Sequence, residues 1–276
     1  MIKKIYILSL LSVFLFSCEE VIEVELEDVA PKLIIDAYFE MITDSNTSYP
    51  DLNNGIKLSV SAPYFDTYIP PVSDATVYIT NMSNNTILSF IESDTPGFFI
   101  PEDAITFIPE ANTPYELTVI YNNETYIATT QLVPTPPINS LTQGDGVLFN
   151  GDETEIIVEF TDDAERVDYY LFDLDFDLYV LSEDTFYQGQ VFNFSYFYDS
   201  EVLDMDTITV KIVGIDETYY NYFNLILQQS EQDGNPFQTA PALIKGNIIN
   251  TTNSDNYAFG YFRISETNSQ TITLIR

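Results

Sequence analysis

Histidine and tryptophan are absent from this 276-residue chain, and it has a single cysteine. Without histidine, neither a Ser-His-Asp triad nor a Cys-His pair can form, and a zinc site built from cysteine and histidine is excluded. One cysteine forms no disulfide within the chain, so other interactions must stabilise the fold. Catalysis would have to use carboxylates, tyrosine, serine or the few basic residues. We therefore expect that the protein is not an enzyme and holds no cofactor.

Basic residues are also scarce: 9 lysines and arginines stand against 43 aspartates and glutamates, for a net charge of −34 at pH 7. Such a charge repels the phosphates of nucleic acid and the surface of an anionic bilayer. Nucleic acid is therefore an unsuitable partner, and membrane attachment would need an anchor. The chain is nevertheless 45% hydrophobic, with 20 Phe and 20 Tyr, which is enough apolar material to build a core rather than a disordered chain.

The first 17 residues have the proportions of a secretory signal peptide. Two lysines precede an apolar run over residues 5–16, which is shorter than the roughly 20 residues of a transmembrane helix. The letters "LFS" before Cys18 resemble a bacterial lipobox, in which the cysteine becomes diacylglyceryl-modified, although Phe16 is bulky for that motif. We predict an acylated Cys18 that holds the protein in a lipid bilayer, since each buried methylene contributes about 0.8 kcal/mol. A transmembrane anchor and an unmodified cysteine are the alternatives.

Residues 18–31 form an acidic tether. Glu19 and Glu20 follow the cysteine directly, an arrangement that resembles the surface-export signal of Bacteroidota lipoproteins. A solvated spacer without signal value is the alternative, and the two are compatible. The resemblance implies an outer-membrane lipoprotein that faces the cell exterior.

The rest of the chain reads as short strands separated by turns. Residues 113–133, for example, alternate apolar and polar side chains around an Asn-Asn turn, which predicts a hairpin. Many short strands with frequent turns are typical of β-sandwiches. Residues 134–140 contain three prolines in four positions and predict a linker, with a loop inside one larger domain as the alternative. We expect a mostly β protein of two sandwich-like domains, the first immunoglobulin-like over 32–133 and the second over 141–276.

The second domain should contain one helix packed on its sheet. Aromatic residues recur at helical spacing over residues 217–231, Asp216 is a suitable N-cap, and the letters "DGNP" follow. Residues 168–182 instead alternate with a period of two. This run predicts one strand with Phe and Leu on one face and Asp on the other.

Three of those aspartates form a candidate metal site. Asp173, Asp175 and Asp177 have the spacing of calcium-loop ligands, but Leu178 stands where such a loop needs glycine. On a strand, carboxylates two residues apart lie roughly 6.5–7 Å from each other. A solvated strand face and a calcium site completed by a neighbouring strand both remain open.

Tyrosine is amphipathic, and clusters of it favour interfaces and ligand grooves. Five tyrosines are candidates for an exposed ligand-binding patch, with core packing as the alternative. They are Tyr196, Tyr198, Tyr219, Tyr220 and Tyr222.

Thr207 lies in the letters "DTI", which resemble the O-glycosylation sequon of exported Bacteroidota proteins. Burial of this threonine in a strand is the alternative.

Four segments together resemble the DUF4249 family of Bacteroidota lipoproteins, a domain of unknown function. They are the acidic segment leading into "PKLIIDAYFE", then "VSDATVYITN", "TYYNYFNLILQQ" and "NPFQTAPALIKGNIINTTNSDNYAFGYFRIS". The last is the most specific, with "KGNI" and "GYF" in order. The first strands also resemble the immunoglobulin-like modules of TonB-dependent receptors. The family brings no catalytic residues, and its members are commonly encoded beside receptors of the SusC type.

The resemblance implies a lipoprotein that works with a TonB-dependent receptor as its partner and helps to capture a nutrient without catalysis. Such a binding module predicts a concave groove lined by Tyr or Phe with converging polar groups. A structural or assembly subunit of an outer-membrane complex is one alternative, and it predicts a flat apolar patch. A carboxylate-based hydrolase is another, and it predicts two buried carboxylates in a cleft, at least one with a raised pKa.

Overall fold

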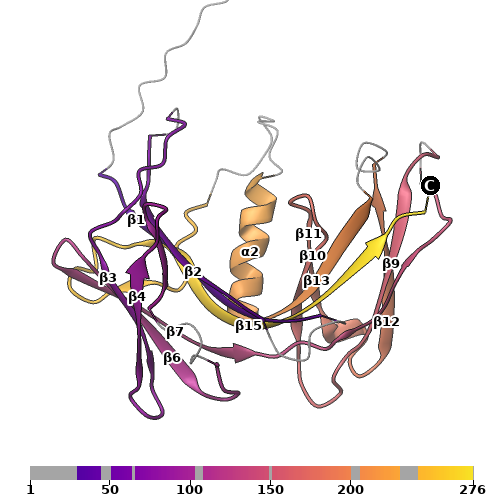
Figure 1. Ribbon diagram of the computed structural model, residues 1–276, viewed down its shortest axis with the longest axis horizontal. Helices are drawn as coiled ribbons and strands as arrows, with labels where there is room; N and C mark the ends of the chain where they lie inside the picture. Colours follow the sequence, from indigo (N-terminus) through magenta and orange to yellow (C-terminus); the bar gives the residue numbers. More distant parts are fainter. Residues whose placement is uncertain are drawn as a thin grey trace, which may run out of the picture. The chain divides into compact units, whose positions relative to one another are not determined.

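The structure is a computed structural model that describes residues 30–44, 51–63, 66–102, 108–148, 151–199, 206–230 and 242–275. Cys18, Glu19 and Glu20 lie outside these ranges, as does most of the tether. Residues 31–276 form one compact unit, which is mostly β with one α-helix among the described residues (Figure 1). The predicted mostly β class is therefore confirmed.

The strands form two sheets. The large sheet contains, in spatial order, β11 (Tyr179–Glu183), β10 (Tyr169–Asp173), β13 (Thr207–Ile215), β15 (Phe259–Thr273), β1 (Leu33–Asp44), β2 (Asp51–Val60), β5 (Phe98–Pro101), β4 (Ile87–Glu92), β3 (Thr76–Asn81), β6 (Pro114–Tyr121), β7 (Glu124–Val133) and β14 (Ile249–Asn250). The small sheet contains β12 (Val191–Tyr198), β9 (Thr154–Thr161) and β8 (Ile138–Gln143).

The long strand β15 connects the two halves of the chain. It pairs with β1 in parallel and with β13 in antiparallel orientation, and it also pairs with β7 through Ile264 and Leu132. The large sheet is therefore continuous across the proline-rich segment 134–140. The division into two sandwich domains at that segment remains a prediction.

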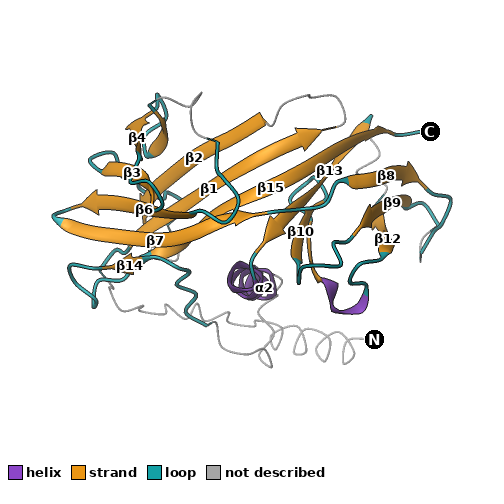
Figure 2. Cartoon of the chain, turned by 90° about the horizontal axis from the view of Figure 1, so that it is seen from below, coloured by secondary structure: helices purple, strands orange, loops and turns teal. Residues whose placement is uncertain are grey.

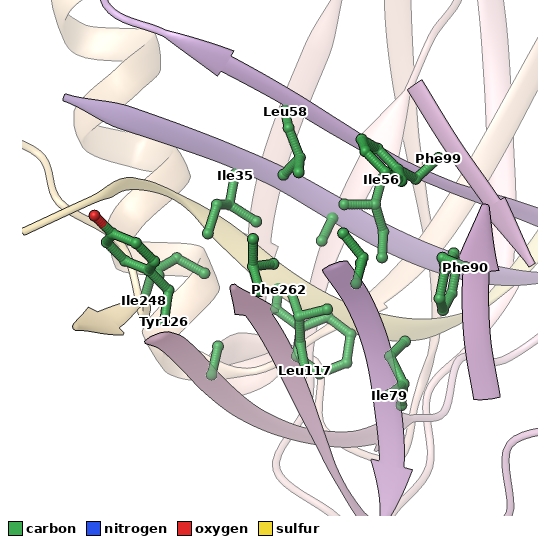
Figure 3. Close-up of a cluster of buried hydrophobic side chains, with 14 of the residues drawn as sticks. Ile35, Ile56, Leu58, Ile79, Phe90, Phe99, Leu117, Tyr126, Ile248 and Phe262 are labelled. Carbon is green, nitrogen blue, oxygen red and sulfur yellow. The ribbon is translucent and has the colours of Figure 1, made fainter. Parts of the chain in front are cut away.

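The main hydrophobic core comes from the strands of the first half together with β15. The β15–β7 pairing closes β15, β1, β2, β5, β4, β3, β6 and β7 into a ring. Alternate residues of each strand, such as Ile35, Ile56, Leu117 and Phe262, point toward one another in this core (Figure 3). The period of two in these segments thus sets which side chains are buried.

A second core lies between the small sheet and strands β10 and β13 of the large sheet. Phe160 of β9 is at its centre, with ring centroids 5.5 Å from Tyr170, 5.6 Å from Phe172, 5.7 Å from Tyr187 and 5.9 Å from Phe192. Aromatic pairs of this kind contribute about 0.5–1.5 kcal/mol each beyond the area that they bury. Packing of one sheet on another therefore stabilises the second half of the chain.

The single strand predicted over residues 168–182 is wrong. The segment is a hairpin: β10 ends at Asp173, residues 174–178 form the turn, and β11 begins at Tyr179. Asp175, Phe176 and Asp177 have φ angles of 68°, 52° and 59°, and the Asp173 carboxylate accepts the N–H of Asp175 at 3.1 Å. Aspartate side chains that bond to nearby backbone groups favour turns and tolerate this left-handed conformation, which outweighed the period-two pattern.

The predicted helix is confirmed as α2 (Glu217–Ser230). Asp216 caps it by accepting the N–H of Tyr219 at 2.7 Å. Tyr219 also joins the apolar cluster that the helix shares with β10, β13 and β15, and Figure 2 shows α2 end-on beside this part of the sheet. Within the described part of the chain, no helix combines the length and the apolar character needed to cross a bilayer.

Candidate ligand-binding cleft

A cleft of about 600 Å³ lies between α2 and the large sheet. Strand alternation creates it: Asp36, Tyr38 and Glu40 of β1 line the cleft, whereas Ile35 and Phe39 belong to the main core. Strand β15 alternates in the same way. The volume falls within the roughly 300–1,000 Å³ of small-molecule sites.

Tyrosine and phenylalanine rings form one wall of the cleft. The rings of Tyr219 and Tyr222 on α2 each lie 4.9 Å from the ring of Tyr261 on β15, and Tyr219 stacks on Phe223 at 5.7 Å. Burial raises the pKa of Tyr222 to about 12 and also raises the pKa of Tyr219. These phenols therefore stay neutral at physiological pH.

A nearly buried ion pair lies in the cleft lining. Arg263 of β15 binds Glu40 of β1, and their side chains are 12% and 9% exposed. The guanidinium also lies over the rings of Tyr38 and Tyr219, at 5.4 and 5.2 Å from their centroids. Burial by itself would lower the pKa of Arg263, but Tyr219 and Glu40 outweigh it and raise that pKa. The arginine is therefore permanently charged and held from three sides.

Lys211 of β13 forms the second ion pair of the cleft, with Asp173 at 3.0 Å. Burial opposes the lysine charge, but the hydrogen bond that Lys211 donates to Asp173 and the negative charges of Asp173 and Glu40 together outweigh it and raise the pKa of Lys211. The remaining charged residue in the lining is Asp36. Asp36 lies in the wall of the cleft, so part of its side chain is exposed to the cleft and the rest is covered by neighbouring residues. This burial raises the pKa of Asp36, against the opposing charges of Arg263 and Lys57.

The aspartate run from the sequence does not adopt the strand spacing on which the predicted calcium site relied. Asp173 holds Lys211, and Asp175 accepts the N–H of Thr209 at 3.1 Å. With Asp177, these residues lie at a hairpin turn rather than along one strand face. The predicted spacing of these carboxylates along one strand face is therefore wrong, because the segment turns after Asp173.

Among the described residues, a different trio of carboxylates converges. Ligand oxygens of Asp162, Asp168 and Asp184, all buried, lie within 4.8 Å of one another. The Tyr170 hydroxyl donates to Asp162 at 2.5 Å, the backbone N–H of Asp168 donates to Asp184 at 2.7 Å, and Arg166 pairs with Asp168 at 3.1 Å. Burial raises the pKa of Asp168, and Arg166 opposes this effect. Protein groups thus already bind these oxygens, which fits a structural role in joining β9, β10 and the segment before β12.

The five candidate tyrosines do not form one exposed patch, so that prediction needs correction. Tyr219 and Tyr222 line the cleft, whereas Tyr220 faces Tyr169 at 5.2 Å. Tyr196 and Tyr198 are on β12, in the other sheet, and pack in the second core. Tyr198 is only 1% exposed, because alternate residues of β12 point toward the large sheet.

Thr207 is exposed at the start of β13. Burial in a strand therefore does not apply to it, and its glycosylation stays a prediction.

Sequence reasoning missed the charged residues of the cleft. Asp36, Glu40 and Arg263 are polar positions on the outer face of strands β1 and β15, and the alternation of those strands was the available signal. It also missed the Glu124 network, in which Asn250 and Asn256 donate to the Glu124 carboxylate at 3.0 and 2.5 Å. No local pattern points to that network, because its members are about half the chain apart.

The fold and the site define a class of protein: a mostly β chain whose described helix covers a tyrosine-lined cleft. The chain belongs to the family described as Domain of unknown function (DUF4249), whose model matches residues 19–271. A search of curated proteins finds no match. Among solved structures, the FN1–FN3 domains of chicken CNTN1 are similar at 11% identity and a TM-score of 0.24, over 67% of this chain and 60% of that one. This chain thus spans less than two thirds of that structure, and so low a TM-score supports no inference.

Proposed function

We propose that this chain is a lipid-anchored outer-membrane protein that binds a nutrient ligand for a SusC-like TonB-dependent transporter, without chemical change to the ligand. The observation that supports it is the cleft beneath α2, where aromatic rings and charged side chains converge as expected of a binding module. Family membership supports the receptor partnership, because the resemblance implies that association. The segment around Cys18 motivates the location at the cell exterior.

Binding is favoured over hydrolysis by the arrangement of the cleft carboxylates. Asp36 has the raised pKa that a hydrolase needs. Glu40, however, is four residues further along the same strand, which separates the two Cα atoms by about 13 Å, and it is held by Arg263. Paired glycosidase carboxylates lie roughly 5–10 Å apart. Asp173, the other carboxylate in the described lining of the cleft, is held by Lys211, so Asp36 has no second free carboxylate there with which to share the chemistry.

The finer division of the fold belongs to the same proposal. Residues 32–133 would form the immunoglobulin-like sandwich and residues 141–276 the second sandwich, with 134–140 as the linker. Residues 138–140 belong to β8, so the part of this segment between strands is 134–137. Limited proteolysis tests this division: we expect cleavage within 134–137 to precede cleavage elsewhere in residues 32–276. Protection of this segment under conditions that cut other loops would mean that it is a loop of one larger domain.

The proposal is tested by affinity purification of the full-length protein from native membranes. We expect recovery of a TonB-dependent receptor, and we expect labelled palmitate in the wild type but not in Cys18→Ser. Absence of the receptor would count against the proposal, and palmitate-independent membrane retention of Cys18→Ser would remove the lipid anchor from it.

Two neighbouring tyrosines on α2 separate ligand capture from the alternative assembly role. Tyr222 lines the cleft and Tyr220 packs on Tyr169 outside it. If the protein captures a ligand, Tyr222→Ala should retain the receptor but impair uptake of the nutrient, and Tyr220→Ala should do neither. Uptake that is insensitive to Tyr222→Ala, with the receptor retained, would favour the structural subunit.

A further inference from the structure

The charged residues in the cleft lining are paired with one exception. Glu40 binds Arg263 and Asp173 binds Lys211. Asp36 forms no side-chain hydrogen bond and no ion pair with any residue that the structure describes, and its surface is exposed to the cleft. The cleft therefore offers a ligand one unpaired carboxylate, whereas both of its cations are already neutralised.

Aromatic rings share the cleft with this carboxylate. Tyr38, Tyr219 and Tyr222 line the same cleft, and Tyr38 is two residues from Asp36, on the same face of β1. Ring faces attract cations through their quadrupole, and an adjacent carboxylate adds to that attraction. The rest of the lining includes apolar side chains such as Phe223 and Ile226, which would contact an apolar body.

We propose that the cleft binds an organic cation, a primary amine or guanidinium on an apolar body, with Asp36 as its counter-ion. This inference rests on the proposed ligand-binding function and names the ligand class for the same cleft. The net charge of −34 favours the same class, because it attracts cations and repels anions over distance.

Lys57 is a cation of the protein itself that lies close to Asp36. The two residues lie opposite each other in the β1–β2 register, and Lys57 is exposed. Its charge acts on Asp36 but, in the described structure, the two form no ion pair. Since Lys57 repels an incoming cation, Lys57→Met should strengthen amine binding, which gives the proposal a test that leaves Asp36 intact.

The experiment uses three probes with one body and different head groups: phenethylamine, 2-phenylethanol and phenylacetate. Calorimetric titration of the full-length protein in non-ionic detergent, with empty micelles subtracted, measures their affinities. We expect the amine to bind about tenfold more tightly than the alcohol, because its ammonium group can pair with the partly exposed Asp36 carboxylate and contact the aromatic rings. Phenylacetate should bind most weakly.

Asp36→Asn should abolish the preference for the amine over the alcohol. Asp74→Asn is the matched control, because it removes the same charge from an exposed position outside the cleft and should retain the preference. Thermal unfolding of both variants verifies that they are folded, and Lys57→Met should raise amine affinity severalfold.

The outcomes separate this inference from the proposed function. If the alcohol binds as well as the amine, or if Asp36→Asn keeps the preference, the organic-cation proposal is overturned while a ligand-binding cleft stands. If none of the three probes binds, the organic-cation proposal is also overturned. The proposed function is then judged by receptor recovery and by the uptake of the Tyr222→Ala variant.

Discussion

A close backbone contact beside the cleft leads to a sharp stability prediction. Gly246 has a φ of +79°, and a Cβ placed on it would lie 1.7 Å from the carbonyl oxygen of Gly260. Gly260 itself lines the cleft, and the ring of Tyr222 would be 3.4 Å from the same Cβ. Gly151 has nearly the same φ, +81°, but a Cβ there meets nothing within 4 Å. The two glycines therefore differ in surroundings and match in φ.

The magnitudes follow from that comparison. Alanine in the left-handed region costs about 1–2 kcal/mol at either position. Only Gly246→Ala must also displace the backbone of β15, and forced displacement in a packed site costs typically about 1–3 kcal/mol more. We expect Gly246→Ala to lower the free energy of unfolding by about 2–5 kcal/mol and Gly151→Ala by about 1–2 kcal/mol. The larger loss is a substantial share of the roughly 5–15 kcal/mol of a typical protein.

Equilibrium denaturation in urea, followed by far-UV circular dichroism, measures both losses. Because the displaced strand lines the cleft, Gly246→Ala should also weaken binding of the probes above, and Gly151→Ala should not. Equal losses for the two variants would refute the reasoning, since the close contact with Gly260 would then contribute nothing.

Three further predictions concern other interactions. Arg263→Met leaves the buried Glu40 without its cation and should cost about 3–5 kcal/mol in the same denaturation assay; adding Glu40→Gln should recover part of this loss, and no recovery would contradict the pairing. Asp216→Ala removes the N-cap of α2 and should cost about 1 kcal/mol, with faster amide exchange confined to the first helical turn. Hydrogen bonds from Tyr126 and nearby asparagines lower the pKa of Glu124 from 4.5 to about 2, so its stabilisation is present above pH 4.5 and is lost as the pH falls toward 2. The difference in melting temperature between wild type and Glu124→Gln should shrink across that window, and a constant difference would argue against the network.

Several elements were predictable because their signals are local. The hairpin of β6 and β7 turns at Asn122 and Asn123, which have φ angles of 49° and 62° and belong to a residue type that tolerates this conformation. The helix α2 begins at its predicted cap, where one side chain satisfies one backbone N–H three residues later. Such features need only a few neighbouring residues, so a linear pattern contains most of the information.

The aspartate run and the tyrosine patch were not predictable in this way. A period of two is equally compatible with one strand and with a hairpin whose turn residues happen to alternate. The hydrogen bond from the Asp175 N–H to the Asp173 carboxylate favours the turn. Tyr198 and Tyr219 have similar chemistry, but Tyr198 is buried between the two sheets and Tyr219 lines the cleft. The difference lies in what packs against each element.

Composition and short-range pattern thus established a mostly β chain with a capped helix, a strongly acidic surface, no histidine chemistry and no zinc site built from cysteine and histidine. They also established which face of each regular strand is apolar, because alternation is a property of the strand alone. The cleft depends on a partner strand: Glu40 and Arg263 are 223 residues apart and meet through the parallel pairing of β1 with β15. Strand register over such a separation results from packing of the whole sheet, and no local preference encodes it.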